Sequence, residues 1–234
     1  MRIVRNERRI RVLSFIGQYA TLAGLLALLI GLIISFTKPE WLVPMLVSVT
    51  LGFGLSVMGG FFADRYAGPL AHHDALARTL KGLDDRYALL QYRLPAPHVL
   101  LEPGGCTVFV VKAQGGEVTY EDGRWKHRQR GKFFRQFAGQ EAVGAPHAEA
   151  EHQVRKLERY LARHLPDIEV PIRAAIVFVN PDVTLDAAAS PVPAFYGKKV
   201  KAWLRGPGKR KPLPAAVQRR LAEAIGITPR QGKD

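Results

Sequence analysis

Hydrophobic residues are concentrated in two long runs near the N-terminus. Residues Val12–Thr37 carry no charged side chain, and after Lys38 and Glu40 the run Trp41–Ala63 is again free of charge. Each run exceeds the roughly 20 residues that an apolar helix needs to cross a bilayer. A cleaved signal peptide has a shorter apolar core and is not followed by a second apolar run. The pattern therefore predicts a transmembrane helical hairpin over residues 12–63.

The charges that flank the two runs predict how the hairpin is oriented. Residues 1–11 form a basic N-terminus, whereas the loop between the runs carries one cation and one anion. Cations favour the cytoplasmic side of a membrane, and two spans return the chain to the side from which it started. We therefore expect a multi-pass protein of the inner (cytoplasmic) membrane with two spans, both termini cytoplasmic, and a linker over residues 64–71 that contains Gly68-Pro69.

Small residues recur along both apolar runs. The second run contains Ser48, Gly52, Ser56 and Gly60 at four-residue spacing, and the first contains Ala20, Gly24, Ala27, Gly31 and Ser35. Stripes of small residues allow two helices to approach closely. Two interpretations stay open: the stripes pack the two spans of one hairpin together, or they form a homo-oligomer interface.

Residues 72–225 show the alternation of elements that is typical of an α/β domain with a mixed central sheet. Two short apolar strands are joined by Pro103-Gly104-Gly105, whose glycines permit a tight reversal. The expected strands are Tyr87–Leu94, Val99–Leu101, Thr107–Val111, a pair within Glu117–Arg128, and Ile172–Val179. The expected helices are His72–Leu83, Pro146–His164 and Pro214–Ile225, with an extended stretch over Pro191–Arg205 and a flexible tail over residues 226–234.

The chain is strongly basic, with a net charge of +14 and a pI near 10.2. Such a balance favours an anionic partner, either nucleic acid or an anionic membrane surface. The candidate anion-binding cations are Lys126, Arg128, Arg130, Lys132, Arg135, Lys198, Lys199 and Lys201. Near the first five lie Phe133, Phe134 and Phe137, so this segment is suited to grip nucleic acid by stacking, to lie on acidic lipid, or simply to be a solvated loop.

Cys106 is the only cysteine, which excludes an intrachain disulfide and a zinc site built on paired thiols. This usage is consistent with a reducing compartment.

The stretch from His98 to Gly116 carries a family resemblance. His98 precedes one strand, Lys112 ends the next, and Gly116 follows four residues later. This arrangement resembles the nuclease-related domain (NERD) family, whose pattern is Asp-His before a strand, Glu-x-Lys at the end of the next, and then a Gly. The family is related to restriction-endonuclease-like folds, in which the Asp and Glu hold a divalent metal and the Lys positions water or phosphate. The resemblance covers about His72–Ile225 and implies such a fold for the cytoplasmic domain.

Four positions depart from the family pattern. Pro97 and Val110 stand where the family has its Asp and Glu, His73 replaces a helix acid, and Glu149 replaces a Gln. Proline and valine offer no oxygen ligand to a hard cation. We therefore predict a buried Val110, remnants of a site at His98 and Lys112, no metal site, and no cofactor.

These observations lead to three functional hypotheses. The first is a catalytically inactive membrane-anchored module that binds nucleic acid or another anionic partner, or serves as a scaffold. The second is an active nuclease that uses Mg²⁺ or Mn²⁺ and a relocated acid such as Glu102 or Glu117. The third is a structural membrane protein whose basic domain rests on anionic lipid.

Overall fold

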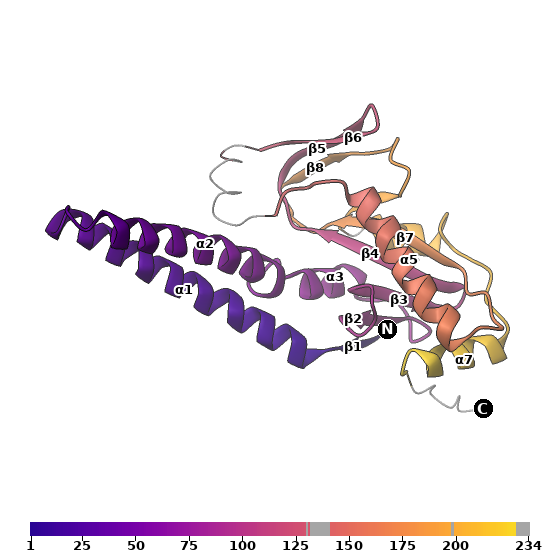
Figure 1. Cartoon of the computed structure of the whole chain (residues 1–234). Coiled ribbons are helices and arrows are strands. Elements are labelled where there is room, and N and C mark those ends of the chain that lie inside the picture. Colours follow the sequence, from indigo (N-terminus) through magenta and orange to yellow (C-terminus); the bar gives the residue numbers. More distant parts are fainter. Residues whose placement is uncertain (130, 132–140, 198, 228–234) are drawn as a thin grey trace. The chain divides into compact units, whose positions relative to one another are not determined.

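A computed structural model describes residues 1–129, 131, 141–197 and 199–227 (Figure 1). Its contacts divide the chain into two compact units. One unit comprises Met1–Asn6, Ala75–His127 and Val143–Asp234, and the other comprises Glu7–Asp74 and Arg128–Ala142. The chain thus leaves the first unit after Asn6 and returns to it at Ala75, after the helical hairpin.

The helical hairpin consists of α1 (Glu7–Thr37) and α2 (Leu42–Tyr66). Both helices are long and apolar enough to cross a membrane, by length and composition. Large apolar side chains cover their outer surfaces, as at Phe15, Leu25 and Val43. The two predicted helices are therefore confirmed, although both extend beyond the charge-free runs: α1 begins within the basic N-terminus and α2 continues into the expected linker.

The seam between α1 and α2 is lined by glycines. Gly17, Gly24 and Gly31 of α1 are buried, as are Gly52 and Gly59 of α2. A Cβ atom on Gly24 would lie 2.6 Å from the backbone nitrogen of Ser56, and the hydroxyl of Ser48 donates a hydrogen bond to the Ala27 carbonyl at 2.6 Å. The small-residue stripes thus pack the two helices of one hairpin against each other, and the homo-oligomer remains a prediction.

The first unit contains a six-stranded sheet in the order β1-β2-β3-β4-β7-β9. Its strands are β1 (Arg2–Arg5), β2 (Ala88–Gln91), β3 (His98–Glu102), β4 (Gly105–Lys112), β7 (Ile172–Phe178) and β9 (Ala194–Tyr196). β3 is antiparallel to its two neighbours, β2 and β4, whereas β1 is parallel to β2, and β7 is parallel to both β4 and β9. The predicted mixed α/β class is therefore confirmed.

The N-terminal segment differs from the expectation of a separate basic arm. Arg2 to Arg5 pair with Ala88 to Gln91, so the chain contributes an edge strand before the hairpin begins. The Met1 ammonium group donates a hydrogen bond to the Leu83 carbonyl at 2.8 Å, and Arg5 Nε donates to Gln91 Oε1 at 2.7 Å. The α/β domain is therefore discontinuous in sequence, with the hairpin inserted between β1 and the rest.

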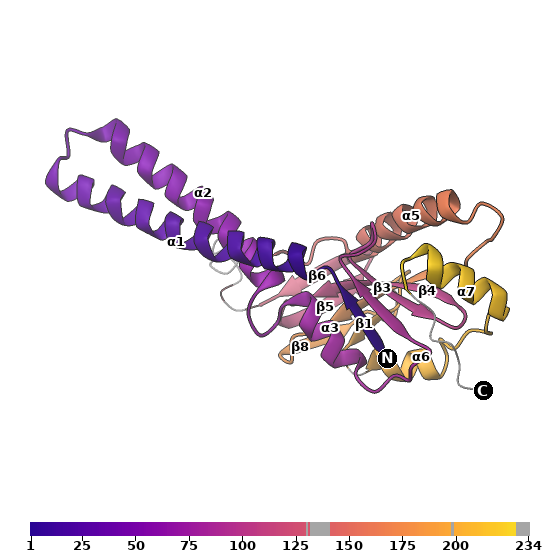
Figure 2. The same cartoon turned by 90° about the horizontal axis from the view of Figure 1, so that it is seen from below.

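Helices cover both faces of this sheet (Figure 2). On one face, Leu157 and Leu161 of α5 (Pro146–His164) and Leu221 of α7 (Ala215–Ala224) pack on the sheet. On the other face lie α3 (His72–Leu80), whose residues from Ala75 onward belong to this unit, and α6 (Lys199–Arg205).

A second, three-stranded sheet has the order β6-β5-β8. β5 (Gly116–Glu121) and β6 (Arg124–Arg128) flank a turn at Asp122 and Gly123, both of which have positive φ angles, and β8 is Val183–Asp186. The predicted strand pair is confirmed, but it lies outside the main sheet. Val118 and Val183 pack with Val110 and Phe178, so the two sheets share a hydrophobic cluster.

The expected extended stretch over Pro191–Arg205 is correct only for β9. Residues from Lys199 onward form α6, because Val200 and Leu204 are one helical turn apart and both are buried against α3.

Candidate functional site

Lys112, the last residue of β4, forms a buried ion pair. Its Nζ lies 3.0 Å from Oε2 of Glu149, in the first turn of α5, and the Lys112 side chain is only 3% exposed. Gln153, one turn further along α5, donates from Nε2 to Glu149 Oε1 at 3.0 Å. Three residues that the sequence could not connect thus form a chain of polar contacts between the end of β4 and α5.

The surroundings of this ion pair are apolar on one side. Val110, two residues earlier on β4, is 1% exposed and packs with Ala150 and Ile176. The predicted burial of Val110 is confirmed.

The segments that follow β4 and β7 close this end of the sheet. Asn180, after β7, donates from Nδ2 to the Ala113 carbonyl at 2.9 Å, and its Oδ1 accepts from the Asp182 amide at 3.0 Å. A Cβ atom on Gly115 would lie 3.1 Å from Asn180 Nδ2, and Gln114 is 1% exposed. These contacts fix the backbone that follows Lys112.

His98 does not join Lys112. Side chains alternate along a strand, and Val99 packs against the α5 face, so His98 belongs to the opposite face of the sheet. There the rings of His98 and Tyr92 lie 5.0 Å apart. The Pro97 carbonyl accepts from the Tyr92 amide at 2.7 Å, which closes a turn in which Tyr92 has φ of 58°. The two predicted remnants of the family site are thus separated by the sheet.

Within the described residues, no group of three or more His, Cys, Asp or Glu side chains is arranged to hold a metal ion. His72 and His73 are both buried, and His73 Nε2 lies 3.5 Å from Asp74 Oδ2.

The two acids that the sequence offered as relocated ligands lie elsewhere. Glu102 ends β3 and is held by Arg173 Nη2 at 3.1 Å, by Arg210 Nη2 at 2.5 Å and by the Thr107 hydroxyl at 2.5 Å. It pairs with Gly105, seven residues before Lys112, which puts it roughly 23 Å from that end of β4. Glu117 is an exposed residue of β5.

Glu102, Arg173, Arg210 and Thr107 form a cluster of ion pairs and hydrogen bonds that stabilises the domain from within. Arg173 lies over the Trp203 ring at 4.1 Å and also donates to the Gly208 carbonyl, which fastens the basic loop after α6 to the sheet. Burial lowers the pKa of Arg173, and the nearby Glu102 charge opposes that shift.

The predicted anion-binding cations differ in their exposure and contacts. Lys126 Nζ lies 2.7 Å from Glu121 and 3.6 Å from Asp122, so two carboxylates already neutralise it. Arg128 is exposed at the end of β6, Lys199 is exposed at the start of α6, and Lys201 donates to the Lys81 carbonyl at 2.8 Å. The remaining four, Arg130, Lys132, Arg135 and Lys198, lie outside the described residues, as do Phe133, Phe134 and Phe137.

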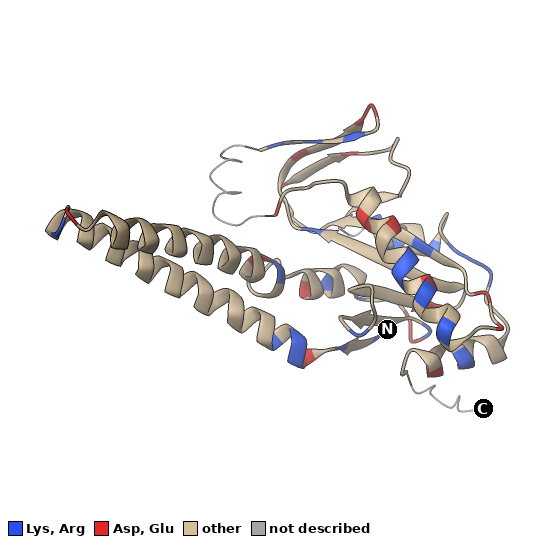
Figure 3. Cartoon of the chain, in the orientation of Figure 1, with Lys and Arg blue, Asp and Glu red and all other residues tan. Residues whose placement is uncertain are grey.

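Sequence reasoning missed a second set of exposed cations, on α5. The α5 basic row consists of Arg155, Lys156, Arg159 and Arg163, all of which are exposed. Figure 3 shows the Lys and Arg positions along α5 in blue. Arg155, Arg159 and Arg163 are spaced by four residues and therefore share one helix face. Of the row, only Arg155 has an ion pair within the described residues, with Glu151 at 3.6 Å. The four-residue spacing of these cations is a signal that the sequence itself carries.

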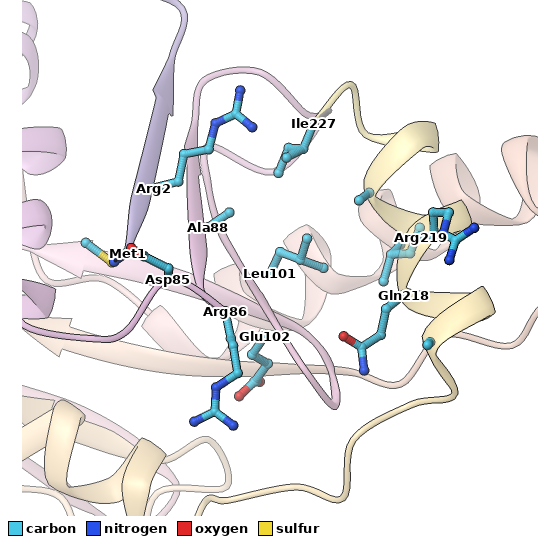
Figure 4. A pocket seen from close by; sticks show the side chains of 13 residues that line it. Met1, Arg2, Asp85, Arg86, Ala88, Leu101, Glu102, Gln218, Arg219 and Ile227 are labelled. Atoms are coloured by element: carbon cyan, nitrogen blue, oxygen red, sulfur yellow. Dashed lines mark hydrogen bonds and ion pairs between the residues drawn. The ribbon is translucent and has the colours of Figure 1, made fainter. Parts of the chain in front are cut away.

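A cavity of about 790 Å³ lies between β1, β2 and α7 (Figure 4). Its floor is apolar, and its rim carries Arg2, Asp85, Arg86 and Arg219. Asp85 accepts from the Met1 ammonium group at 3.3 Å, and Arg86 binds Asp84, outside the cavity. These internal pairs leave a rim of mixed charge.

No protein-family model, curated protein or solved structure matches this chain.

Proposed function

We propose that this protein is a membrane-anchored, non-catalytic module of the nuclease-related type that binds nucleic acid at the cytoplasmic face of the inner membrane. The observation that carries the proposal is the Lys112–Glu149 ion pair. It neutralises the lysine that, in the resembling family, stands at the reaction centre.

The absence of a catalytic role follows from the groups around that lysine. A metal-dependent phosphodiester cleavage requires a fixed carboxylate to hold the ion and to activate water. Glu149 is engaged by Lys112 and Gln153, and the neighbouring Val110 is packed into a hydrophobic cluster. The Lys112 and Glu149 charges at the end of β4 thus neutralise each other, and their contact joins α5 to the sheet.

The binding role rests on surface charge. From Ala71 to the C-terminus the sequence has 27 Lys or Arg against 17 Asp or Glu, a difference of +10. The α5 basic row concentrates four of these cations within nine residues of one helix. Phosphates are the natural partners of such a row, and their counterions are released when they bind.

Nucleic acid is favoured over a lipid surface by what accompanies the cations. A helix that lies on a membrane inserts large apolar side chains beside its basic ones. Outside α1, α2 and Trp41 in the loop between them, the exposed large hydrophobic residues of the described chain are Ile3 and Tyr196, and neither lies on α5. The α5 basic row is therefore better suited to a partner in aqueous solution than to a lipid surface.

The cytoplasmic location is supported by β1 as well as by the flanking arginines. Because β1 pairs with β2, the residues before and after the hairpin lie on the same side of any membrane that the hairpin crosses. The basic residues before α1 favour the cytoplasm for that side.

The direct test is a titration of the full-length protein, in nanodiscs of neutral lipid, with labelled DNA and RNA at several salt concentrations. The test variant carries Arg155→Gln, Arg159→Gln and Arg163→Gln. The matched control carries Arg86→Gln, Lys126→Gln and Arg220→Gln, which removes the same charge from exposed residues that already pair with carboxylates.

We expect the α5 variant to bind more weakly than the control, and its salt slope to fall by up to about 3, since each lost phosphate contact removes about 0.9. Equal losses in both variants would contradict a site on α5. Binding to vesicles of anionic lipid with none to nucleic acid would replace the proposal by the lipid-surface alternative.

A further inference from the structure

A second cavity, of about 500 Å³, lies on the opposite side of the sheet from α5. It is lined by Ala75, Arg78 and Thr79 of α3, by Val179, and by Tyr196, Gly197 and Lys199. All these residues belong to one compact unit. The cavity is thus a feature of the α/β domain alone.

The lining of this cavity is selective in its charge. It contains two cationic residues, Arg78 and Lys199, two residues with hydroxyl groups, Thr79 and Tyr196, and no carboxylate. Both cationic residues are exposed, and Lys199 has no ion pair with any described residue. The lining itself therefore offers an anion cations and hydroxyl groups and contains no carboxylate.

The cations around the cavity extend this character. Lys81 and Lys201 are joined by a hydrogen bond from Lys201 Nζ to the Lys81 carbonyl, and Arg205 donates to the Gly82 carbonyl. Within the described residues none of these three cations forms an ion pair. The ends of α3 and α6 thus carry three cations that form no ion pair with a described carboxylate.

The position of the cavity in the fold is one that often holds ligands. β7 and β9 are parallel, with Phe178 opposite Tyr196, and the cavity residues Val179 and Gly197 come directly after these strand ends. In α/β sheets, ligands bind beyond the carboxyl ends of parallel strands, where loops and helix ends leave space. Arg78 and Thr79 lie on the same face of α3 as Ala75, so one helix face lines the cavity.

We propose that this cavity binds a phosphate monoester, a function that does not depend on the α5 basic row or on the proposed nucleic-acid binding. Lys199 and Arg78 supply the positive charge, and Thr79 supplies a hydroxyl donor. The phosphate group belongs either to a small free ester or to the 5′ end of a nucleic acid strand, and the experiment below distinguishes the two.

The experiment is calorimetric titration of the full-length protein in neutral nanodiscs with inorganic phosphate, adenosine 5′-monophosphate and uncharged adenosine. Two further arms use a short oligonucleotide with and without a 5′ phosphate. The test variants are Lys199→Gln and Thr79→Val, and the matched control is Lys156→Gln, which removes one exposed cation from α5. Circular dichroism checks that each variant keeps the parent's helix content, and Thr79→Val preserves side-chain volume should Lys199→Gln disturb α6.

We expect saturable binding of phosphate and of the monophosphate, none of adenosine, and a roughly tenfold weakening in Lys199→Gln, since a hydrogen bond to a charged group is lost. Thr79→Val should weaken binding less, and Lys156→Gln should leave it unchanged. Preference for the 5′-phosphorylated oligonucleotide over both small ligands would assign the phosphate to a nucleic acid end. Absence of saturable binding in every arm, or equal weakening in Lys199→Gln and Lys156→Gln, would overturn the proposal.

Discussion

Lys112 Nζ and Glu149 Oε2 lie 3.0 Å apart, and this contact joins the end of β4 to the first turn of α5. Lys112 is nearly inaccessible, whereas the Glu149 side chain is 29% exposed. The partly exposed Glu149 carboxylate therefore neutralises the charge of the buried Lys112 ammonium group. A carboxylate in the first turn of a helix is also favoured by the helix dipole.

The first prediction concerns Glu149→Gln. The substitution keeps the shape of the side chain but leaves the Lys112 ammonium group buried without its counter-charge. Removing one partner of a buried pair costs about 3–5 kcal/mol, and we expect the low end because Glu149 is partly exposed. Denaturant unfolding of the full-length protein measures the change.

The control for this substitution is Glu151→Gln, two residues further along α5 and on its exposed face. Its pair with Arg155 is long and solvent-exposed, so the loss should be below about 0.5 kcal/mol. The double variant Glu149→Gln with Lys112→Met should recover most of the stability, because no buried charge remains. A Glu149→Gln protein as stable as the parent would show that Lys112 does not need this partner.

Much of the α/β domain was predictable because its strands and helices are short and strongly patterned. α5 coincides with the predicted Pro146–His164, since its apolar residues recur at helical spacing. β4 was recognisable because Thr107 to Val111 are apolar or β-branched and are buried on both faces.

The parts that escaped prediction depend on long-range contacts. Arg2 to Arg5 are two arginines around Ile3-Val4, without strand periodicity, and only pairing with β2, more than 80 residues away, makes them a strand. The Lys112–Glu149 pair likewise requires the parallel alignment of β4 and β7 that brings α5 over the sheet. In the sequence, Glu149 stands out only as a departure from a family pattern, and nothing marks it as the partner of Lys112.

The second prediction tests the discontinuous domain. A soluble protein of residues 71–234 lacks β1 and exposes the edge of β2, which favours aggregation. A second protein, in which residues 1–6 are joined to residues 71–234 by a flexible Gly/Ser linker of about 15 residues, restores that edge. We expect the second protein to be more stable by at least about 2 kcal/mol, because several backbone hydrogen bonds contribute about 0.5–1.5 kcal/mol each.

Urea unfolding and light scattering of the two soluble proteins give the comparison. A linker variant with Arg2 and Arg5 both replaced by Gln serves as a control, since it keeps the strand and removes its charges. Equal midpoints for the proteins with and without residues 1–6 would show that β1 does not contribute to the domain.

The third prediction concerns pH and Cys106. Burial raises the pKa of the Cys106 thiol from 9.0 to about 12. The folded protein keeps this proton at a pH at which the unfolded chain releases it, so this contribution to stability is complete below pH 9 and is lost as the pH rises toward about 12. At pH 9 we expect iodoacetamide to alkylate Cys106 only after unfolding, as followed by mass spectrometry. Alkylation of the native protein as rapid as that of a free thiol would contradict the burial.

The fourth prediction concerns membrane topology. It relies on Cys106 being buried, so that the native cysteine does not react with a thiol reagent. In intact cells, an impermeant maleimide should label a Thr37→Cys variant from outside and should miss a Gly226→Cys variant. Permeabilised cells provide the control, since both variants should then react. Labelling of Gly226→Cys alone in intact cells would reverse the proposed orientation.

The most direct test of the account is to measure binding and cleavage on one sample. Full-length protein in neutral nanodiscs is incubated with labelled DNA and RNA in the presence of Mg²⁺ or Mn²⁺, alongside a Lys112→Ala variant assayed below its unfolding temperature. We predict that the parent binds both polymers in a salt-dependent manner and cuts neither, and that Lys112→Ala changes the affinity no more than the loss of any other single charge. Metal-dependent cutting by the parent that disappears in Lys112→Ala would contradict the account and establish the nuclease alternative.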